Sequence, residues 1–288
     1  MSIQKVREYF KQFGIEDRIR EFDVSSATVE LAGGEYVILS GLKHDTTYTV
    51  KTALGLAWIA YVTNEKLTKP ETSSSTPQPT DGTTDTNAQY YPSAAGFEGC
   101  TITLAPTTSP SLPATTSASY SSLRNTSGEA NTLDLSAHLW VPIGNTNSKP
   151  FNGTFDGNHK MITGLMVKVE NKQTGSGTGT SAYAGFFGKL GNNSKVSNLG
   201  IQVEAAQNTT QETENTPIGE IEATSTSGNS YAGALAGYNE QGTIENCFVS
   251  GTGTICSKST SSSGNASSGG LVGYNGGTIT HCYTTVKV

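Results

Sequence analysis

The chain has 288 residues, of which 34% are hydrophobic and 15% are charged, and its formal net charge is −6. This hydrophobic content is low for a globular domain of that size, whereas a thin elongated domain needs fewer hydrophobic residues for its core. The negative charge and the lack of a basic cluster argue against nucleic acid as a partner, because such binding needs Lys and Arg along one face. No run approaches the ~18 apolar residues of a membrane span, and the amino terminus lacks the basic-then-apolar layout of a secretory signal.

Residues 1–32 differ from the rest of the chain and form a separate helical segment in our interpretation. Val6, Tyr9, Phe10 and Phe13 follow the spacing of an amphipathic helix. Residues 2–32 resemble the amino-terminal segment of the YbaK-like prolyl-tRNA editing deacylases. The similarity stops at residue 32, so deacylase activity is not implied. The segment is either a fusion or a natural cap over the first strands.

Residues 33–150 alternate between predicted strands and long polar insertions. Ser, Thr, Pro, Asp and Gly dominate residues 66–91 and 105–131, which we therefore expect to be loops. Residues 54–62 are expected to form a helix, because their apolar residues repeat at helical spacing. The predicted strands are Tyr36–Leu39, Thr47–Val50, Gly99–Leu104, a short strand around Leu133, and Leu139–Ile143.

Residues 151–288 contain a repeated unit that begins after a strand, turn and strand at residues 151–169. In that first part Ile162, Leu165, Val167 and Val169 are expected to point inward. Asp156 and Gly157 form an Asp-Gly pair, a strong turn former whose carboxylate bonds nearby backbone amides. We therefore expect a structural role for this pair. Residues 172–181 and 207–229 are predicted polar loops.

The aligned glycines of the repeat, Gly188, Gly237 and Gly273, lie 49 and 36 residues apart, a spacing typical of stacked repeats. Because glycine tolerates positive φ, we predict that these three residues turn corners. Apolar residues two apart indicate short strands. One unit cannot bury its own apolar side, so Leu271, Val272 and Ile279 are expected to lie over Leu235, Ala236 and Ile244 of the copy before.

Residues 270–274 (GLVGY) and 277–279 (GTI) carry a family resemblance. They resemble the GLUG repeat of bacterial surface and adhesin-like proteins, including regions attached to IgA-specific metallopeptidases. Residues 151–165 look like the segment that precedes such repeats in gut Bacteroidetes proteins, although His159 stands where that pattern has Gly or Asn. The resemblance extends loosely over residues 34–288. It implies an all-β fold, a right-handed parallel β-helix, which also agrees with the general handedness of parallel crossovers.

The four cysteines are Cys100, Cys247, Cys256 and Cys282. Cys247 and Cys282 occupy equivalent places in successive copies, which would set them ~4.8 Å apart, one above the other. Stacked buried thiols are favoured over a disulfide, whose side-chain geometry is specific. Cys282 is expected to point inward and His281 outward, because adjacent strand residues point to opposite faces.

No catalytic or metal-binding constellation is visible, and no cofactor is expected. Hydrolysis of glycosidic bonds needs two facing carboxyl groups, yet Asp156 is the only aspartate after Asp134. The histidines are scattered singly, without the spacing of a zinc site. The remaining acids of the repeat region are expected in or beside a solvated loop; they are Glu204, Glu212, Glu214, Glu220 and Glu222.

The tyrosines that recur with the repeat are the remaining candidates for function. Tyr238 and Tyr274 could form an exposed stacking ladder that suits sugars, but a packing ladder inside the fold is the favoured interpretation. The exclusion of chemistry and the family resemblance together favour a non-catalytic binding or scaffold region of an exported, adhesin-like cell-surface protein. Its expected partner is a host glycan or glycoprotein. The alternatives are a carbohydrate-active lyase or glycosidase and a substrate-positioning module of a larger peptidase.

Overall fold

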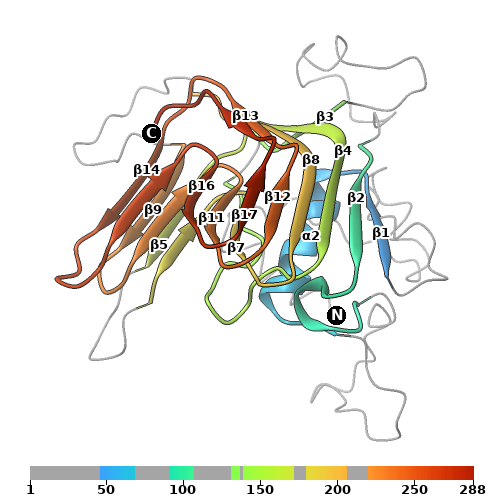
Figure 1. Ribbon diagram of the computed structural model, residues 1–288, viewed down its shortest axis with the longest axis horizontal. Helices are drawn as coiled ribbons and strands as arrows, with labels where there is room; N and C mark the ends of the chain where they lie inside the picture. The colour runs from blue at the N-terminus through green and yellow to red at the C-terminus, as the bar shows by residue number, and fades with distance from the viewer. Residues whose placement is uncertain (1–45, 69–90, 107–130, 137–138, 172–179, 206–219) are drawn as a thin grey trace, which may run out of the picture.

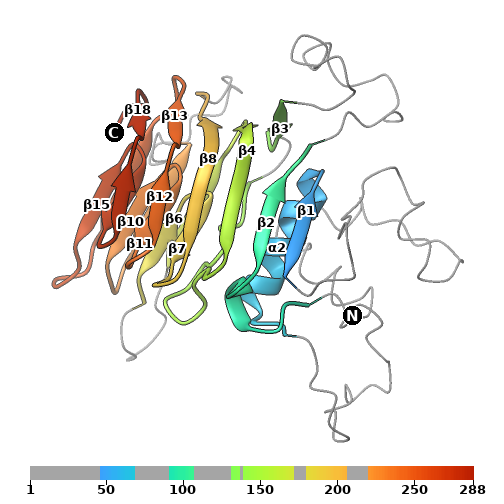
Figure 2. The same ribbon diagram turned by 45° about the vertical axis from the view of Figure 1, so that its right-hand side comes forward.

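A computed structural model of the chain describes residues 46–68, 91–106, 131–136, 139–171, 180–205 and 220–288. Nearly all regular structure in these ranges is β-strand, and the strands lie side by side in one long stack (Figures 1 and 2). Every strand pairing is parallel, and the strands belong to four sheets. The expected all-β class is confirmed. The YbaK-like segment and the strand Tyr36–Leu39 lie outside the described residues.

The first part of the stack carries the α-helix. Strands β1 (Thr47–Val50) and β2 (Thr101–Leu104) pair in parallel, and helix α2 (Ala53–Asn64) runs along them (Figure 2). The hydroxyl of Thr52 accepts a hydrogen bond from the Gly55 amide at 3.1 Å, which caps the helix. A 3-10 turn, η4 (Ala95–Phe97), leads into β2. The predicted helix and both strands are therefore confirmed.

The next strands are β3 (Thr132–Asp134), β4 (Thr154–Thr163) and β5 (Val167–Asn171). The register of β4 shifts between Asp156 and Lys160, and Asn158 and His159 adopt φ values of 51° and 56° there. His159 thus takes the left-handed conformation that Gly and Asn favour, at the position where the family pattern has one of those residues. The residues expected to point inward do so: Ile162, Leu165 and Val167 are buried, and the partly buried Val169 packs against the core.

The repeat region passes through the four sheets three times in the same order, and each passage is called a layer here. The first layer contains β5, β6 (Ala182–Ala184), β7 (Phe187–Leu190) and β8 (Lys195–Gln202). The second contains β9 (Ile221–Ser225), β10 (Ser230–Gly233), β11 (Ala236–Asn239), β12 (Thr243–Glu245) and β13 (Phe248–Ser250). The last contains β14 (Ile255–Ser259), β15 (Ala266–Gly269), β16 (Val272–Asn275), β17 (Thr278–Thr280) and β18 (Tyr283–Thr284).

Equivalent strands of successive layers are hydrogen-bonded neighbours. The largest sheet runs β1-β2-β4-β8-β12-β17, with β3, β13 and β18 beside this path, and the others run β15-β10-β6, β16-β11-β7 and β14-β9-β5. Val272 lies opposite Ala236, and Ile279 lies opposite Ile244. The predicted stacking of one copy on the next is therefore confirmed at the level of single residues.

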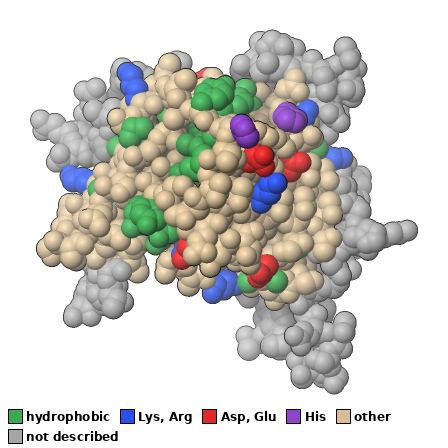
Figure 3. Space-filling model, in the orientation of Figure 1, with side chains coloured by type: hydrophobic (Ala, Val, Ile, Leu, Met, Phe, Trp, Pro, Cys, Tyr) green, Lys and Arg blue, Asp and Glu red, His purple; other side chains and the backbone are tan. Residues whose placement is uncertain are grey.

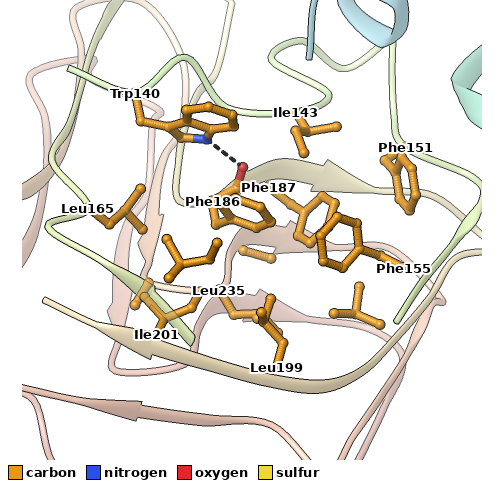
Figure 4. Packing of buried hydrophobic residues seen from close by; sticks show 14 of the residues in the cluster. Trp140, Ile143, Phe151, Phe155, Leu165, Phe186, Phe187, Leu199, Ile201 and Leu235 are labelled. Atoms are coloured by element: carbon orange, nitrogen blue, oxygen red, sulfur yellow. Dashed lines mark hydrogen bonds between the residues drawn. The ribbon is translucent and has the colours of Figure 1, made fainter. Parts of the chain in front are cut away.

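The hydrophobic core fills the space between the sheets (Figure 4). Phe186 and Phe187 are adjacent in sequence, and their rings meet edge to face at 5.0 Å. The Trp140 ring stacks on Phe186 at 5.4 Å, and its Nε1 donates to the Phe186 carbonyl oxygen at 2.9 Å. This bond satisfies the indole N–H, so the large side chain can be buried without an unpaired donor.

Two sequence predictions of secondary structure are wrong. Residues 139–143 form no strand; only Ile143 makes an isolated bridge, to Phe187, since Pro142 has no N–H for a ladder. Instead, the side-chain amide of Asn64, at the end of α2, donates to the Pro142 carbonyl oxygen and accepts from the Gly144 amide. Residues 207–229, predicted as one polar loop, include strand β9.

Candidate functional site

Four tyrosines of the repeat form one cluster on two neighbouring sheets. Tyr183 on β6 lies opposite Tyr231 on β10, and Tyr238 on β11 lies opposite Tyr274 on β16. The rings of each pair are stacked, with centroids 5.7 Å apart in the first pair and 4.6 Å apart in the second. Tyr231 meets Tyr238 and Tyr274 edge to face at 5.1 and 5.9 Å. The tyrosine cluster is therefore a continuous group of rings in contact with one another.

The four rings differ in their exposure to solvent. Tyr183 and Tyr231 are buried, Tyr238 is partly buried, and Tyr274 is 45% exposed. None of the four belongs to the hydrophobic core cluster or to the residues that pack against it. The four rings thus lie outside the core cluster, and Tyr274 is the one that is exposed. Because burial disfavours the phenolate, it raises the pKa of Tyr183, Tyr231 and Tyr238, so these hydroxyls keep their protons at neutral pH.

An ion pair borders the tyrosine cluster. Lys189 on β7 lies opposite Tyr238, and its Nζ is 5.5 Å from the centroid of that ring, within cation–π range. The same Nζ lies 3.1 Å from a carboxylate oxygen of Glu240 and donates to Asn147 Oδ1 at 2.6 Å. Lys189 is almost fully buried, whereas the Glu240 side chain is 40% exposed. The cluster thus combines an accessible aromatic ring with an accessible carboxylate.

A second stacked aromatic pair, which the sequence analysis missed, lies on the largest sheet. The rings of Phe248 and Tyr283 are 5.5 Å apart at 9°, and Tyr283 is 60% exposed. Phe248 lies opposite Gly200, where an added Cβ would come within 2.5 Å of the ring. The signal in the sequence was an aromatic residue directly after the cysteine in both copies. Figure 3 shows that hydrophobic side chains form separate patches on the face of the molecule that it presents.

Gly188, Gly237 and Gly273 do not turn corners, contrary to the prediction. They lie inside β7, β11 and β16, and none of them has a positive φ. Their role is close packing of backbones. A Cβ on Gly273 would lie 2.6 Å from the Gly237 carbonyl oxygen and 2.8 Å from the Ala232 amide nitrogen. Glycine is needed at these positions because there is no room for a side chain, and not because the backbone requires a positive φ.

Asp156 and Gly157 lie within strand β4 and not in the turn that was predicted, although the Asp156 carboxylate does bond a nearby backbone amide. Its Oδ1 accepts hydrogen bonds from the Asn158 amide at 2.9 Å and from Asn198 Nδ2 at 3.0 Å. Asn246 Nδ2 in the next layer is 3.4 Å from Asn198 Oδ1, which continues the ladder. Gly157 lies beside it, and an added Cβ there would be 2.5 Å from the Asn198 carbonyl oxygen.

The cysteine column contains free thiols. Cys247 is buried, and its amide donates to the Cys282 sulfur at 3.3 Å. The prediction of stacked thiols is confirmed, and Cys282 packs against the core while His281 is exposed. Burial raises the pKa of the Cys247 thiol to about 12, so the thiol stays protonated at neutral pH.

Of the acids predicted to be solvated, Glu204 is exposed, Glu220 is partly buried and Glu222 is buried, while Glu212 and Glu214 lie outside the described residues. Glu222 on β9 is only 3% exposed; it lies opposite Lys168 and accepts from the Thr224 hydroxyl at 3.1 Å. Glu220 accepts from the amide and the hydroxyl of Thr254. Within the described ranges, no three His, Cys, Asp or Glu residues gather as a metal site would require. No helix of the described residues has the length and apolarity of a membrane crossing.

Comparison with known families supports the repeat. The model of the GLUG motif matches residues 228–255 and 264–288. These two ranges contain most of the second layer and of the last layer, including Tyr231, Tyr238 and Tyr274. The prediction of GLUG repeats is confirmed for these ranges. No curated protein and no solved structure matches the chain.

Proposed function

We propose that the three layers are turns of a right-handed parallel β-helix. The repeated order of strands through the four sheets supports the proposal, and so does the parallel pairing of each strand with its equivalent in the next layer. A crossover between parallel strands is right-handed in nearly all proteins. In such a rod the interior is filled by packed side chains, so any ligand must be met on the outside.

We propose further that this rod is a non-catalytic binding region of an exported, adhesin-like protein of the bacterial cell surface, and that it binds glycans at the tyrosine cluster. The main support for this proposal is that the Tyr274 ring is 45% exposed and stacks on the ring of Tyr238. The apolar C–H face of a sugar ring stacks well on such a surface. An aromatic ring can supply this contact at little cost, because its neighbours already fix its orientation.

The polar border of the cluster suits the rest of a sugar. Glu240 is 40% exposed and can accept hydrogen bonds from hydroxyl groups, while Lys189 holds its carboxylate in place. Because Lys189 is buried by its own partners, the cluster offers no free cation to a negatively charged group. The preferred ligand is therefore a neutral glycan, of the kind carried by host glycoproteins.

The test is a glycan array probed with the full chain and with two matched variants. Tyr274→Ala should lose at least about tenfold in affinity for the glycans that the wild type binds, as expected for an aromatic anchor. Tyr283→Ala removes an even more exposed ring from the other aromatic pair and should keep the affinity. A wild-type chain that binds no neutral glycan, or a loss confined to Tyr283→Ala, would refute this site. New reducing ends or unsaturated products from bound polysaccharides would instead show an enzyme.

A further inference from the structure

The Lys189 side chain is an amine held almost entirely out of solvent. This side chain is 5% exposed, and its Nζ lies 3.1 Å from a carboxylate oxygen of Glu240 and 5.5 Å from the centroid of the Tyr238 ring. Proteins use desolvated lysines as amine nucleophiles, and a carboxylate at hydrogen-bonding distance can accept the proton that the amine must lose. By contrast, Lys195 on β8 pairs with Glu245 at 3.5 Å but is 48% exposed, so water stabilises its charge.

The loop that precedes Phe151 is attached to Lys189 at both ends. The Lys189 amide donates to the Gly144 carbonyl oxygen at 2.8 Å, and the Lys189 carbonyl oxygen accepts from the Phe151 amide at 3.0 Å. Between these two bonds, residues 146–149 form a turn that contains Asn147 and is closed by a hydrogen bond of 3.2 Å. The backbone itself therefore holds Asn147 close to Lys189.

The carboxamide of Asn147 lies within reach of the amine. Nζ of Lys189 donates to Oδ1 of Asn147 at 2.6 Å and lies 3.4 Å from the backbone carbonyl oxygen of the same residue. Because a C=O bond is about 1.2 Å long, the carboxamide carbon, Cγ, is at most about 3.8 Å from Nζ. Atoms that are poised for attack lie about 3–3.5 Å apart. Asn147 is exposed, so a small rotation of its side chain can bring Cγ to that distance.

We propose that Lys189 and Asn147 form an isopeptide bond, and that Glu240 acts as the proton acceptor. The Lys189 ammonium passes a proton to the Glu240 carboxylate, and the neutral amine attacks Cγ of Asn147. A bond forms between Nζ and Cγ, and the bond between Cγ and Nδ2 breaks. Nζ gives up two protons in all, which leave with Nδ2 as an ammonium ion, while Glu240 returns to a carboxylate. Atoms and charge balance without an oxidant or a reductant.

The cross-link ties the loop to β7 and joins two residues that are 42 positions apart in the sequence. Such a link restricts the unfolded chain, as a disulfide does. The four cysteines are free thiols and supply no link of this kind. The amide N–H that remains on Nζ still lies beside the Glu240 carboxylate, so the polar border of the tyrosine cluster is kept.

The test is the intact mass of the full chain together with a tryptic digest. The wild type should be lighter than its sequence mass by one molecule of ammonia, and trypsin should fail to cut after Lys189. The fragment that contains Lys189 should instead remain joined to the fragment that contains Asn147. Glu240→Gln keeps the shape of the side chain but cannot accept the proton, so the linked fraction should fall at least about tenfold at a fixed time after purification. An undiminished linked fraction would contradict the role given to Glu240.

Lys189→Met and Asn147→Ala should both carry the full mass of their sequences, and Asn147→Ala guards against misfolding because it changes an exposed residue. Asn193→Ala is the matched control, because Asn193 is an exposed carboxamide that donates to Glu98 at 3.0 Å, and it should keep the mass deficit. A wild type that retains its full mass after several days at neutral pH contradicts the proposal. A deficit that survives Lys189→Met contradicts it too, since cyclisation of Asn147 onto its own backbone also releases ammonia. The mass needs no ligand, so failure here is distinguishable from failure of the glycan array.

Discussion

The strongest test of the layered core compares the same substitution in two successive layers. Ile244 and Ile279 are equivalent residues of β12 and β17, and they face the same column of the core. Ile244 is 0% exposed with a layer on either side, whereas Ile279 is 36% exposed with a layer on one side. Ile244→Ala and Ile279→Ala therefore remove the same three carbons from two environments that differ mainly in covering.

The magnitudes follow from transfer and cavity terms. At ~0.8 kcal/mol per buried carbon, Ile244→Ala loses ~2.4 kcal/mol of transfer free energy. The enclosed cavity raises the total to about 3–4 kcal/mol. For Ile279→Ala the transfer loss scales with burial to ~1.5 kcal/mol, and no closed cavity forms because solvent reaches the site.

The assay is urea unfolding followed by far-UV circular dichroism, at a concentration where the chain is a 30.1 kDa monomer. The free energy of unfolding should fall at least about twice as far for Ile244→Ala as for Ile279→Ala. Equal losses would falsify the reasoning, because they would mean that Ile279 is covered as completely as Ile244. A negligible loss at Ile244 would show that the two layers do not stack.

Three further predictions concern single residues. Gly237→Ala should lower the free energy of unfolding by about 1–3 kcal/mol in urea melts, because its Cβ would lie 2.9 Å from the Ala184 amide nitrogen. His281→Asn should raise the free energy of unfolding by about 0.5 kcal/mol in urea melts, since His281 has φ 53° and Asn tolerates that conformation better. Above pH 9 the unfolded chain loses the Cys247 proton, while folding keeps the thiol pKa at about 12. The free energy of unfolding should therefore fall as the pH rises from 9 towards 12, by at most ~1.4 kcal/mol per pH unit. Cys247→Ala should remove this part of the pH dependence.

The candidate site could be predicted only in part. The recurrence of Tyr238 and Tyr274 marked them as a ladder, and the structure stacks their rings at 4.6 Å. Recurrence favoured a packing ladder inside the fold, whereas in the structure these rings lie outside the core cluster and Tyr274 is exposed. The Lys189 and Glu240 pair was missed because Lys189 stands at the tyrosine position of its own layer, so the repeat pattern conceals it.

The glycines show how a correct pattern can carry a wrong interpretation. Their spacing aligned the copies, but Gly188, Gly237 and Gly273 proved to be strand residues in crowded surroundings. Positive φ occurs instead at residues such as Asn198, Asn246 and His281, which occupy equivalent corners. Sequence spacing reveals that a position is special, whereas the reason depends on which backbones pass beside it.

The sequence by itself determined the β class, the alignment of the copies and the pairs that meet between layers, because alternation and repetition are local properties of the chain. Only the tertiary structure decided what depends on neighbours distant in sequence. Ile244 is buried while the equivalent Ile279 is exposed, and Glu222 is buried although a solvated loop was expected for it. Identical patterns acquire different burial because each layer is covered by the next, and the last described layer is covered by none.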